Sequence, residues 1–258
     1  MMRLLSWNLN YRVKRIKEQI EALVTLETDV LALQEVTEKT ATIFHQELRQ
    51  AGYPYIIDSF QQASSLDLLK GPRRYGELVA SKWPLKPLPL FAHPWPERVL
   101  VVALETPTQT THLYTTHIPP GVSNGWIKIE MLESLYDHLA KQNYSPCILC
   151  GDFNTPQAET LSGEVITWGK VGTRWDAGER NVLQGLADFG LKDVYRFVHG
   201  YQTQEFSWYA RNHAGRRFDH IMASPSLLNG VQCRYIHSLR EQGLSDHSAI
   251  IADFVLTL

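Results

Sequence analysis

Hydrophobic positions along the chain form short apolar runs and longer stripes with helical spacing. The run at residues 3–8 predicts a short strand. A stripe with spacings of three and four predicts one buried face of a helix; it consists of Val13, Ile16, Ile20, Leu23 and Val24. Residues 29–33 then predict a buried strand that ends at Gln34-Glu35. The opening unit is therefore strand, helix, strand.

The same order of elements returns in the middle of the chain. β-Branched residues are enriched in residues 99–104 and 111–116, which predicts two strands joined around Pro107. A second amphipathic helix is predicted from Ile129, Leu132, Tyr136 and Leu139. The other predicted elements are a short helix over residues 183–191 and strands over 146–150, 218–223, 231–237 and 249–256. The pattern predicts an α/β or α+β fold.

Three segments interrupt this pattern. Residues 59–76 and 84–96 are predicted excursions, and the second holds five prolines in thirteen residues. Because proline removes a ladder donor, residues 84–96 are predicted to be a surface crossing or an edge. Residues 155–180 are predicted to be a long connection, and long connections are often functional.

Composition limits the class of protein. With 258 residues, 44% hydrophobic and 20% charged, the chain is predicted to be a folded globular protein. It has no apolar run of membrane-spanning length, and it turns polar at Asn8 too early for a signal-peptide core, so we expect a cytoplasmic location. The net charge of −2 excludes a whole-molecule positive field, so a polyanion would have to be bound by local charges or a metal.

Polar residues collect where the predicted strands end. Glu35 follows a buried apolar run, so its carboxylate must be solvated, paired or bound to a cation. Asp152 and Asn154 are two positions apart and would share one face of an extended strand, although the Gly-Asp-Phe-Asn tetrapeptide could also form a turn. A carboxylate beside an amide is suited to holding a water next to phosphorus.

Histidines occupy similar places. The Asp246-His247 pair precedes a predicted strand and is either a local turn or an imidazole that acts on a phosphate or water, with Asp219 as the orienting carboxylate. His117 ends a predicted strand before a Pro-Pro-Gly turn. Carboxylates, an amide and imidazoles together favour a hard cation, Mg²⁺ or Mn²⁺, over structural zinc.

The chain has three cysteines, too few and odd in number for a disulfide framework. Cys147 and Cys150 form a Cys-x-x-Cys pattern, but at this spacing in a strand they would point to opposite faces. We therefore interpret them as core residues.

Six motifs distributed from position 6 to position 247 carry a family resemblance. They are Ser6-Trp7-Asn8, Leu33-Gln34-Glu35, Thr116-His117-Ile118-Pro119-Pro120-Gly121, Gly151-Asp152-Phe153-Asn154, Arg217-Phe218-Asp219-His220-Ile221 and Ser245-Asp246-His247. In this order they resemble the endonuclease/exonuclease/phosphatase superfamily. The resemblance implies a four-layered α/β sandwich, and a single domain over residues 1–258, because one site draws on both ends of the chain.

The resemblance also implies roles for the motif residues. Glu35 would be the principal metal ligand, with Asn8 nearby. Asp152 and Asn154 would position and activate the attacking water. The other roles implied are that His247 contacts the scissile phosphate, Asp246 holds His247 or a second metal, Asp219 supports a histidine, and His117 donates to the phosphate or leaving oxygen.

The branch of the superfamily stays open. The Pro-Pro-Gly turn and residues 206–209 resemble the apurinic-site repair endonucleases. The chain departs from them at His117, where they have tyrosine, at Thr37, where they tend to have lysine, and near Arg216, where they have an aromatic residue. A histidine at position 117 is more similar to the pancreatic-type deoxyribonuclease, sphingomyelinase and deadenylase branches.

Three functions compete on this basis. The first is a magnesium-dependent nuclease acting on DNA. Its candidate backbone contacts are Arg73, Arg74, Lys170, Arg174, Arg211, Arg216 and Arg217, and its candidate stacking surfaces are Trp168, Trp175 and Trp208. The second is a phosphoesterase acting on a phospholipid head group or another small phosphate ester, with Phe91 and Trp95 in the proline-rich loop. The third is a non-catalytic binding module. No obligate protein partner is implied.

Overall fold

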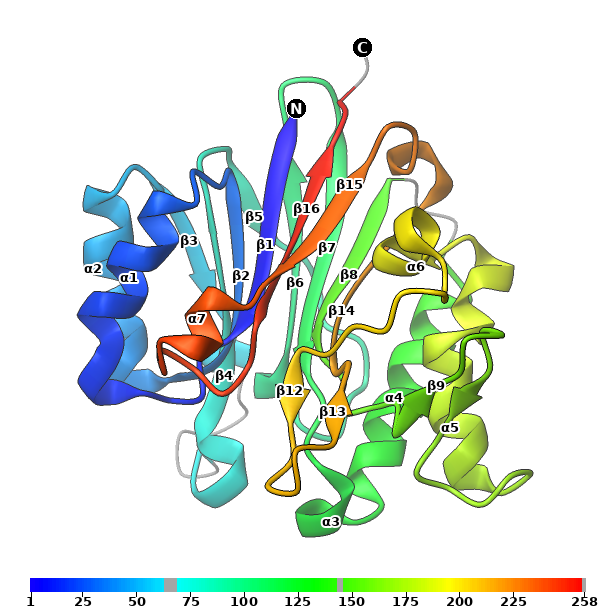
Figure 1. The fold of residues 1–258 in the computed structure, drawn as a ribbon. Helices are drawn as coiled ribbons and strands as arrows, with labels where there is room; N and C mark the ends of the chain where they lie inside the picture. Colours follow the sequence, from blue (N-terminus) through cyan, green and yellow to red (C-terminus); the bar gives the residue numbers. More distant parts are fainter. Residues whose placement is uncertain (63–68, 143–145, 257–258) are drawn as a thin grey trace.

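Two large β-sheets pack face to face in the computed structural model, and helices cover the outer face of each sheet (Figure 1). The structure describes residues 1–62, 69–142 and 146–256. The predicted α/β class and the four-layered sandwich implied by the resemblance are confirmed. The predicted excursion at residues 59–76 includes residues 63–68, which lie outside the described residues.

The first sheet contains the two ends of the chain. Its strands, in spatial order, are β15 (Gln232–Ile236), β16 (Ala249–Phe254), β1 (Met2–Asn8), β2 (Val30–Thr37), β4 (Tyr75–Ser81) and β3 (Tyr55–Asp58). β1 runs parallel to β2 and antiparallel to β16. The first and last strands are therefore hydrogen-bonded neighbours.

The second sheet contains the middle of the chain. Its strands, in spatial order, are β11 (Lys192–Asp193), β14 (Asp219–Ala223), β8 (Cys147–Asp152), β7 (Thr110–His117), β6 (Val99–Glu105) and β5 (Leu85–Pro87). β7 and β8 are parallel, and β14 is antiparallel to β8. β5 is the edge strand, which confirms the edge predicted from the prolines of residues 84–96. Two small ribbons are formed by β9 (Ala158–Glu159) with β10 (Val165–Ile166) and by β12 (Trp208–Tyr209) with β13 (Gly215–Arg216).

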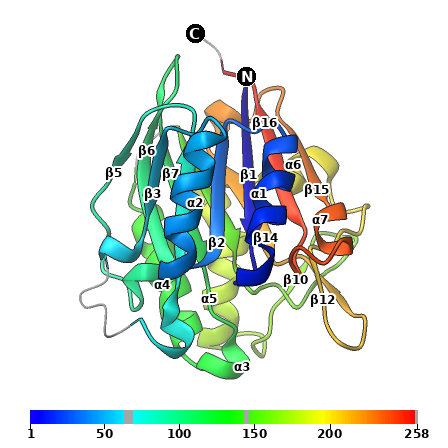
Figure 2. The ribbon, with the colours of Figure 1, turned by 90° about the vertical axis from the view of Figure 1, so that its left-hand side faces the viewer.

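Helices form the outer layers. α1 (Ile16–Thr25) and α2 (Glu38–Gln50) lie on the first sheet, as Figure 2 shows, and α4 (Ile127–Leu139) and α5 (Arg174–Leu183) lie on the second. The shorter helices are α3 (Gly121–Asn124), α6 (Val194–His199) and α7 (Ser238–Glu241). Short 3₁₀ segments are η1 (Val13–Arg15), η2 (Phe60–Gln62), η4 (Gly71–Arg74), η5 (Pro96–Arg98), η6 (Gly185–Phe189) and η7 (Pro225–Leu227). None of the helices in the described part of the chain has the length and apolarity needed to cross a membrane.

Three apolar layers separate these elements. Leu4, Val102 and Ile221 belong to the layer between the sheets, while the other two layers lie under α1 with α2 and under α4 with α5. Cys150 lies in the central layer and Cys147 in the layer under α4. The prediction that these cysteines are core residues on opposite faces is confirmed.

Two predictions about the helices are wrong. The predicted helix at residues 183–191 is a 3₁₀ segment, η6, which follows the true helix α5. Residues 155–180, predicted as a connection, contain β9, β10 and the start of α5. α5 begins at a Thr173 cap whose side chain accepts from the Asp176 backbone N–H, a local signal that the spacing of apolar residues does not reveal.

A buried ionic cluster ties the 155–205 region to the second sheet. Glu159 accepts hydrogen bonds of 2.7 Å from both Arg196 and Arg217, and Arg217 also pairs with Asp193 at 2.8 Å. Burial raises the pKa of Glu159, but Arg217 and Arg196 outweigh it and lower the pKa to about 2 from 4.5. The cluster is therefore stable only while its carboxylates are ionised.

We expect this cluster to make the protein sensitive to acid. Because the folded pKa of Glu159 lies below its unfolded value, its stabilisation is complete above about pH 4.5 and is lost as the pH falls through about 2. The shift corresponds to about 3 kcal/mol. Urea unfolding of wild type and Glu159→Gln between pH 2 and 7 measures it. The free energy of unfolding of the variant should be lower than that of wild type at pH 7 and should change less with pH below 4.5. Parallel pH profiles for the two proteins would contradict the role of Glu159 in acid sensitivity.

Candidate active site

Topology brings the polar strand ends to one edge of the sandwich. β1, β2, β7 and β8 all end there, and the antiparallel strands β14 and β16 begin there. The side chains delivered to this edge are those of Asn8, Glu35, His117, Asp152, Asp219 and His247. A rigid ladder fixes each of these residues while the adjoining loops leave them open to a ligand.

Hydrogen bonds join the two sheets across this edge. The Asn8 Nδ2 donates to Asp152 Oδ2 at 2.8 Å and to Glu35 Oε1 at 3.3 Å. The Asn8 Oδ1 accepts from the Asn10 backbone N–H at 2.9 Å. Asn8 therefore holds carboxylates from both sheets in one place.

The segment before β16 is fixed onto the end of β1. The Trp7 Nε1 donates to the His247 carbonyl at 3.0 Å, and the Ser245 Oγ donates to the Asn8 carbonyl at 2.6 Å. The same hydroxyl oxygen accepts from the His247 N–H at 3.1 Å. The serine and the tryptophan of the first and last motifs thus place His247 in the site.

Glu35 occupies a strained backbone position. The register between β2 and β4 shifts between Leu33 and Val36, and Glu35 has φ of +57°, a left-handed conformation that is costly for a residue other than glycine. Its Oε2 is buried and has no hydrogen-bond partner among residues 1–62, 69–142 and 146–256. Burial is the main cause that raises its pKa. An unpaired buried carboxylate oxygen of this kind fits a cation ligand.

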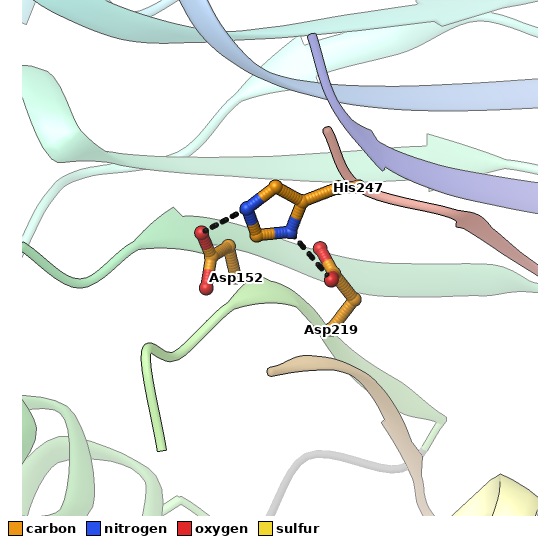
Figure 3. Close-up of side chains that lie close together, drawn as sticks. All are labelled: Asp152, Asp219 and His247. Atoms are coloured by element: carbon orange, nitrogen blue, oxygen red, sulfur yellow. Dashed lines mark hydrogen bonds and ion pairs between the residues drawn. The ribbon is translucent and has the colours of Figure 1, made fainter. Parts of the chain in front are cut away.

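His247 lies between two buried carboxylates, as Figure 3 shows. Its Nδ1 donates to Asp219 Oδ2 at 2.8 Å, and its Nε2 lies 3.7 Å from Asp152 Oδ2. Burial lowers the pKa of His247, but Asp219 and Asp152 outweigh it and raise the pKa to about 10. For Asp152 the effect of burial has the other sign: burial raises its pKa to about 7, although the charge of His247 opposes this.

The three residues could also be considered as a metal site, because one ligand atom from each lies within 4.8 Å of the others. Both ring nitrogens of His247 face these carboxylates, one of them through the 2.8 Å hydrogen bond to Asp219. We therefore interpret Asp152, His247 and Asp219 as a hydrogen-bonding relay, and Glu35 as the group that fits a cation.

His117 is held as a neutral donor. The Arg98 Nη1 donates to His117 Nδ1, so the proton of the ring is on Nε2. The Nε2 lies 3.5 Å from Glu35 Oε1 and 3.7 Å from Asp152 Oδ2. Burial, followed by the charges of Arg98 and His247, lowers the pKa of His117 well below its usual value. An N–H donor therefore points at the centre of the site.

The Gly-Asp-Phe-Asn motif has a clear local structure. Gly151 has φ of +137°, and a Cβ there would lie 1.9 Å from the Thr116 carbonyl oxygen, so only glycine fits between β7 and β8. Asp152 Oδ1 accepts from the Asn154 N–H at 2.8 Å, and the Asn154 Nδ2 donates to the Ile118 carbonyl at 2.9 Å. The motif therefore combines a strand end with a turn.

Asp246 contacts a tryptophan instead of the neighbouring histidine. Its Oδ2 accepts from the Trp208 Nε1 at 3.1 Å, whereas the hydrogen-bonded carboxylate of His247 is that of Asp219. The charge of Asp246 still contributes to raising the pKa of both Glu35 and His247. Asp246 thus lies at the rim of the site and orients Trp208.

Five of the seven predicted backbone contacts are exposed or lie over an aromatic ring. Arg216 lies over the Trp168 ring at 5.6 Å beside the site, and Arg74 lies over the rings of Tyr11 and Tyr75. Arg211 and Lys170 are exposed on loops. Arg174 is exposed, pairs with Glu133 at 2.6 Å and lies over Trp126.

The other two predicted backbone contacts, Arg73 and Arg217, have carboxylate partners inside the protein. Arg217 is 4% exposed and is bound by Glu159 and Asp193, so its prediction as a backbone contact is wrong. Arg73 donates at 2.6 Å and 2.8 Å to the buried carboxylate of Glu97. Neither pairing is visible in the sequence, because the partners are distant along the chain.

Two functional side chains were not predicted at all. Arg98, which fixes the tautomer of His117, is the last residue of η5, directly before β6. Lys128 is buried in α4, pairs with Glu179 and donates at 3.0 Å to the Asn154 carbonyl. Neither residue belongs to one of the six motifs, and no local signal in the sequence identifies either of them.

Comparisons with known proteins agree with this geometry. The model of the endonuclease/exonuclease/phosphatase family matches residues 5–247. The chain belongs to this family. Its members hydrolyse phosphate esters, and the chain is accordingly a hydrolase of that class. The resemblance predicted from the six motifs is therefore confirmed.

Individual relatives of this family match over the whole chain. Exodeoxyribonuclease III of Haemophilus influenzae is 23% identical over 278 residues, covering 98% of the chain and all of the relative. An AP endonuclease from Archaeoglobus fulgidus has a TM-score of 0.76 at 22% identity, covering 99% of the chain and 100% of that structure. A 3′ phosphatase from Neisseria bound to a product DNA hairpin has a TM-score of 0.70 at 21% identity, with the same coverage. At such identities these structures support the fold alone.

Proposed function

We propose that the chain is a divalent-metal-dependent nuclease that hydrolyses a phosphodiester of DNA by in-line attack of water. The convergence of Glu35, Asp152, His117 and His247 from both sheets carries this proposal. The names of the relatives support DNA as the substrate: an exodeoxyribonuclease, an AP endonuclease and a phosphatase bound to a DNA hairpin. We further propose that residues 1–258 form one catalytic domain and that the protein is cytoplasmic.

The metal ligands in this proposal begin with Glu35. Its unpartnered Oε2 supplies the anionic oxygen that Mg²⁺ or Mn²⁺ prefers, and Asn8 and Asp152 lie next to it. Asp246 at the rim is the candidate for a second ion. When bound, the cation would neutralise charge on the phosphate and on the leaving oxygen.

The remaining residues supply the proton chemistry. Asp152, with its raised pKa, accepts a proton from the attacking water, and the Asn154 amide orients that water. The His247 imidazolium, held by Asp219, donates to a phosphate oxygen as charge develops on it. The His117 Nε2–H donates to the phosphate or to the leaving oxygen. In this proposal Asp152 therefore acts on the attacking water and His247 on the phosphate, while His117 acts on the phosphate or on the leaving oxygen.

The aromatic residues on which the phospholipid hypothesis drew are partly buried. Phe91 stacks on His138 with ring centroids 4.2 Å apart, and Phe91 and Trp95 both pack against the apolar layer under α4. Part of each ring is therefore taken up by contacts inside the protein.

A substrate panel tests the proposal. Plain DNA, abasic DNA, RNA, sphingomyelin and inositol phosphates are incubated with Mg²⁺ and, separately, with a chelator. We expect hydrolysis of DNA with Mg²⁺ and none with chelator, because the chelator would remove the ion that Glu35 is proposed to hold. Hydrolysis of sphingomyelin faster than DNA, or DNA cleavage that persists in chelator, would contradict it.

A further inference from the structure

One polar side chain is buried in the face of α1 that packs on the first sheet (Figure 2). Gln19 is 1% exposed, and the other buried residues of this helix are Ile16, Ile20 and Leu23. These three belong to the apolar layer under α1 and α2. Because burying an amide without hydrogen bonds is costly, Gln19 requires partners inside this layer.

The amide of Gln19 joins two segments that are far apart in the sequence. Its Nε2 donates to the Leu9 carbonyl at 2.9 Å and to the Leu244 carbonyl at 2.8 Å. Both acceptors are carbonyl oxygens, so the NH₂ group of the amide faces them and uses both of its hydrogens. Leu9 directly follows Asn8, and Leu244 directly precedes Ser245. One side chain therefore holds the end of β1 and the segment that leads into β16.

The backbone near these carbonyls is irregular. After Leu9 the chain passes through Asn10 and Tyr11 with φ of +49° and +37°, a left-handed conformation that is costly for residues other than glycine. The Arg12 N–H reaches the Leu9 carbonyl only at 3.5 Å. The second carbonyl lies between α7 and β16. Both lie outside the strands, so Gln19 supplies a restraint that the ladder between β1 and β16 does not.

The same two segments carry groups of the candidate active site. Asn8 donates to Asp152 Oδ2 at 2.8 Å, and the Nε2 of His247 lies 3.7 Å from the same oxygen. The Ser245 Oγ joins the two segments directly by donating to the Asn8 carbonyl, and Gln19 fixes both of them to α1. A misplacement of about 1 Å in such a site can lower the rate by about 10²-fold. The packing of α1 therefore affects how Asn8 and His247 are aligned.

We propose that Gln19 is a positioning residue for hydrolysis of the phosphodiester. It acts from the outer side of the first sheet, where its amide keeps the segments that carry Asn8 and His247 in fixed positions relative to each other. The inference rests on the proposed function for the reaction, whereas the two hydrogen bonds that carry it do not depend on a substrate.

Replacing Gln19 with methionine removes both donors and keeps a side chain of similar length. We expect the kcat of Gln19→Met on DNA with Mg²⁺ to fall by about 10-fold and its KM to stay within about 2-fold, because alignment is lost while the surface that binds DNA is kept. The matched control is Leu23→Ala, which removes apolar contacts from the same face of α1 and no donor. It should lower the thermal midpoint and keep the kcat of wild type.

Amide hydrogen exchange tests the positioning without catalysis. The backbone N–H groups of Leu9 and Leu244 are each hydrogen-bonded at 3.0 Å, so their exchange reports on the opening of the two segments. In Gln19→Met we expect each to exchange about 2-fold to 12-fold faster, the range that loss of one hydrogen bond typically gives. Leu23→Ala should not raise exchange in these two segments above that in the rest of the first sheet.

Wild type alone provides a second measurement, which holds even if Gln19→Met does not fold. Both side-chain amide hydrogens of Gln19 should be protected from exchange with water, because both are hydrogen-bonded inside the protein. Those of Gln46, which is exposed on α2, should exchange freely. NMR of the side-chain amides measures both.

A Gln19 amide that is unprotected in wild type would overturn the inference, as would a Gln19→Met enzyme with the kcat of wild type. An equal fall of kcat in Leu23→Ala would also overturn it, since the effect would then belong to the packing of α1. Faster exchange in both segments of Gln19→Met, together with a wild type that does not hydrolyse DNA, would refute the proposed function and keep Gln19 as the residue that holds the segments. Hydrolysis of DNA by wild type with unchanged kcat and exchange in Gln19→Met would do the reverse.

Discussion

Replacing Glu35 with glutamine is expected to lower the Mg²⁺-dependent kcat on DNA by about 10²-fold or more while the protein still folds. The Glu35 Oε2 is buried without a partner and its backbone is strained, so the carboxylate is held at a cost in folding free energy. Glutamine keeps the shape of the side chain and removes its charge. Steady-state kinetics with saturating Mg²⁺ measures the loss.

Binding of the ion should also be measurable as a change in thermal stability. Mg²⁺ is expected to raise the thermal midpoint of wild type and to leave that of Glu35→Gln unchanged, because an ion stabilises a fold only by binding to it. Glu38→Gln, at the exposed start of α2, is the control and should behave as wild type in both measurements. A Glu35→Gln variant that keeps either its kcat or its Mg²⁺-induced shift would remove Glu35 from the metal site.

Replacing Asp219 with asparagine is expected to lower kcat by about 10²-fold or more and to change the pH profile. In wild type the carboxylates of Asp219 and Asp152 keep His247 protonated up to about pH 10, against the effect of burial. Removing the charge of Asp219 lowers the pKa of His247, so the imidazolium is lost at lower pH. The alkaline decline of kcat should therefore move toward neutral pH.

The control for this change is Asp137→Asn, on the exposed side of α4. It should leave both kcat and the alkaline limb as they are in wild type. An Asp219→Asn enzyme with reduced kcat but an unmoved alkaline limb would show that His247 titration does not set that limb, and the proposed role of the imidazolium would fail.

Most of the main strands and helices could be predicted because the sequence patterns that mark them are local. Apolar runs identify β1, β6, β7 and β8, and helical spacing identifies α1 and α4. α2 was missed, although Ala41, Phe44 and Leu48 follow helical spacing and Thr37 forms a capping box with Thr40, because polar residues dominate that segment. The motif residues were predicted because they stand at strand ends, where parallel strands share one edge.

The supporting residues could not be predicted for a physical reason. Arg98 and Lys128 act through partners that only the tertiary structure brings near. Arg98 donates to His117 on the neighbouring strand, and Lys128 in α4 donates to the Asn154 carbonyl. The cavity lined by Asn154, Trp168 and Trp175 is also formed only by the tertiary structure, since both tryptophans lie in residues 155–180, which the sequence analysis predicts to be a connection. Spacing along the chain reports which face a residue occupies, and it does not report which distant side chain it will meet.

The pairing of the first strand with the last has a consequence for synthesis. Met2 lies opposite Phe254 in the ladder between β1 and β16, and His247 reaches the site only through the segment fixed to Trp7. While the ribosome still holds β16, the nascent chain does not have His247 in the site, and the first sheet lacks β16. A chain built in this way completes its candidate active site only after β16 has been synthesised and has paired with β1.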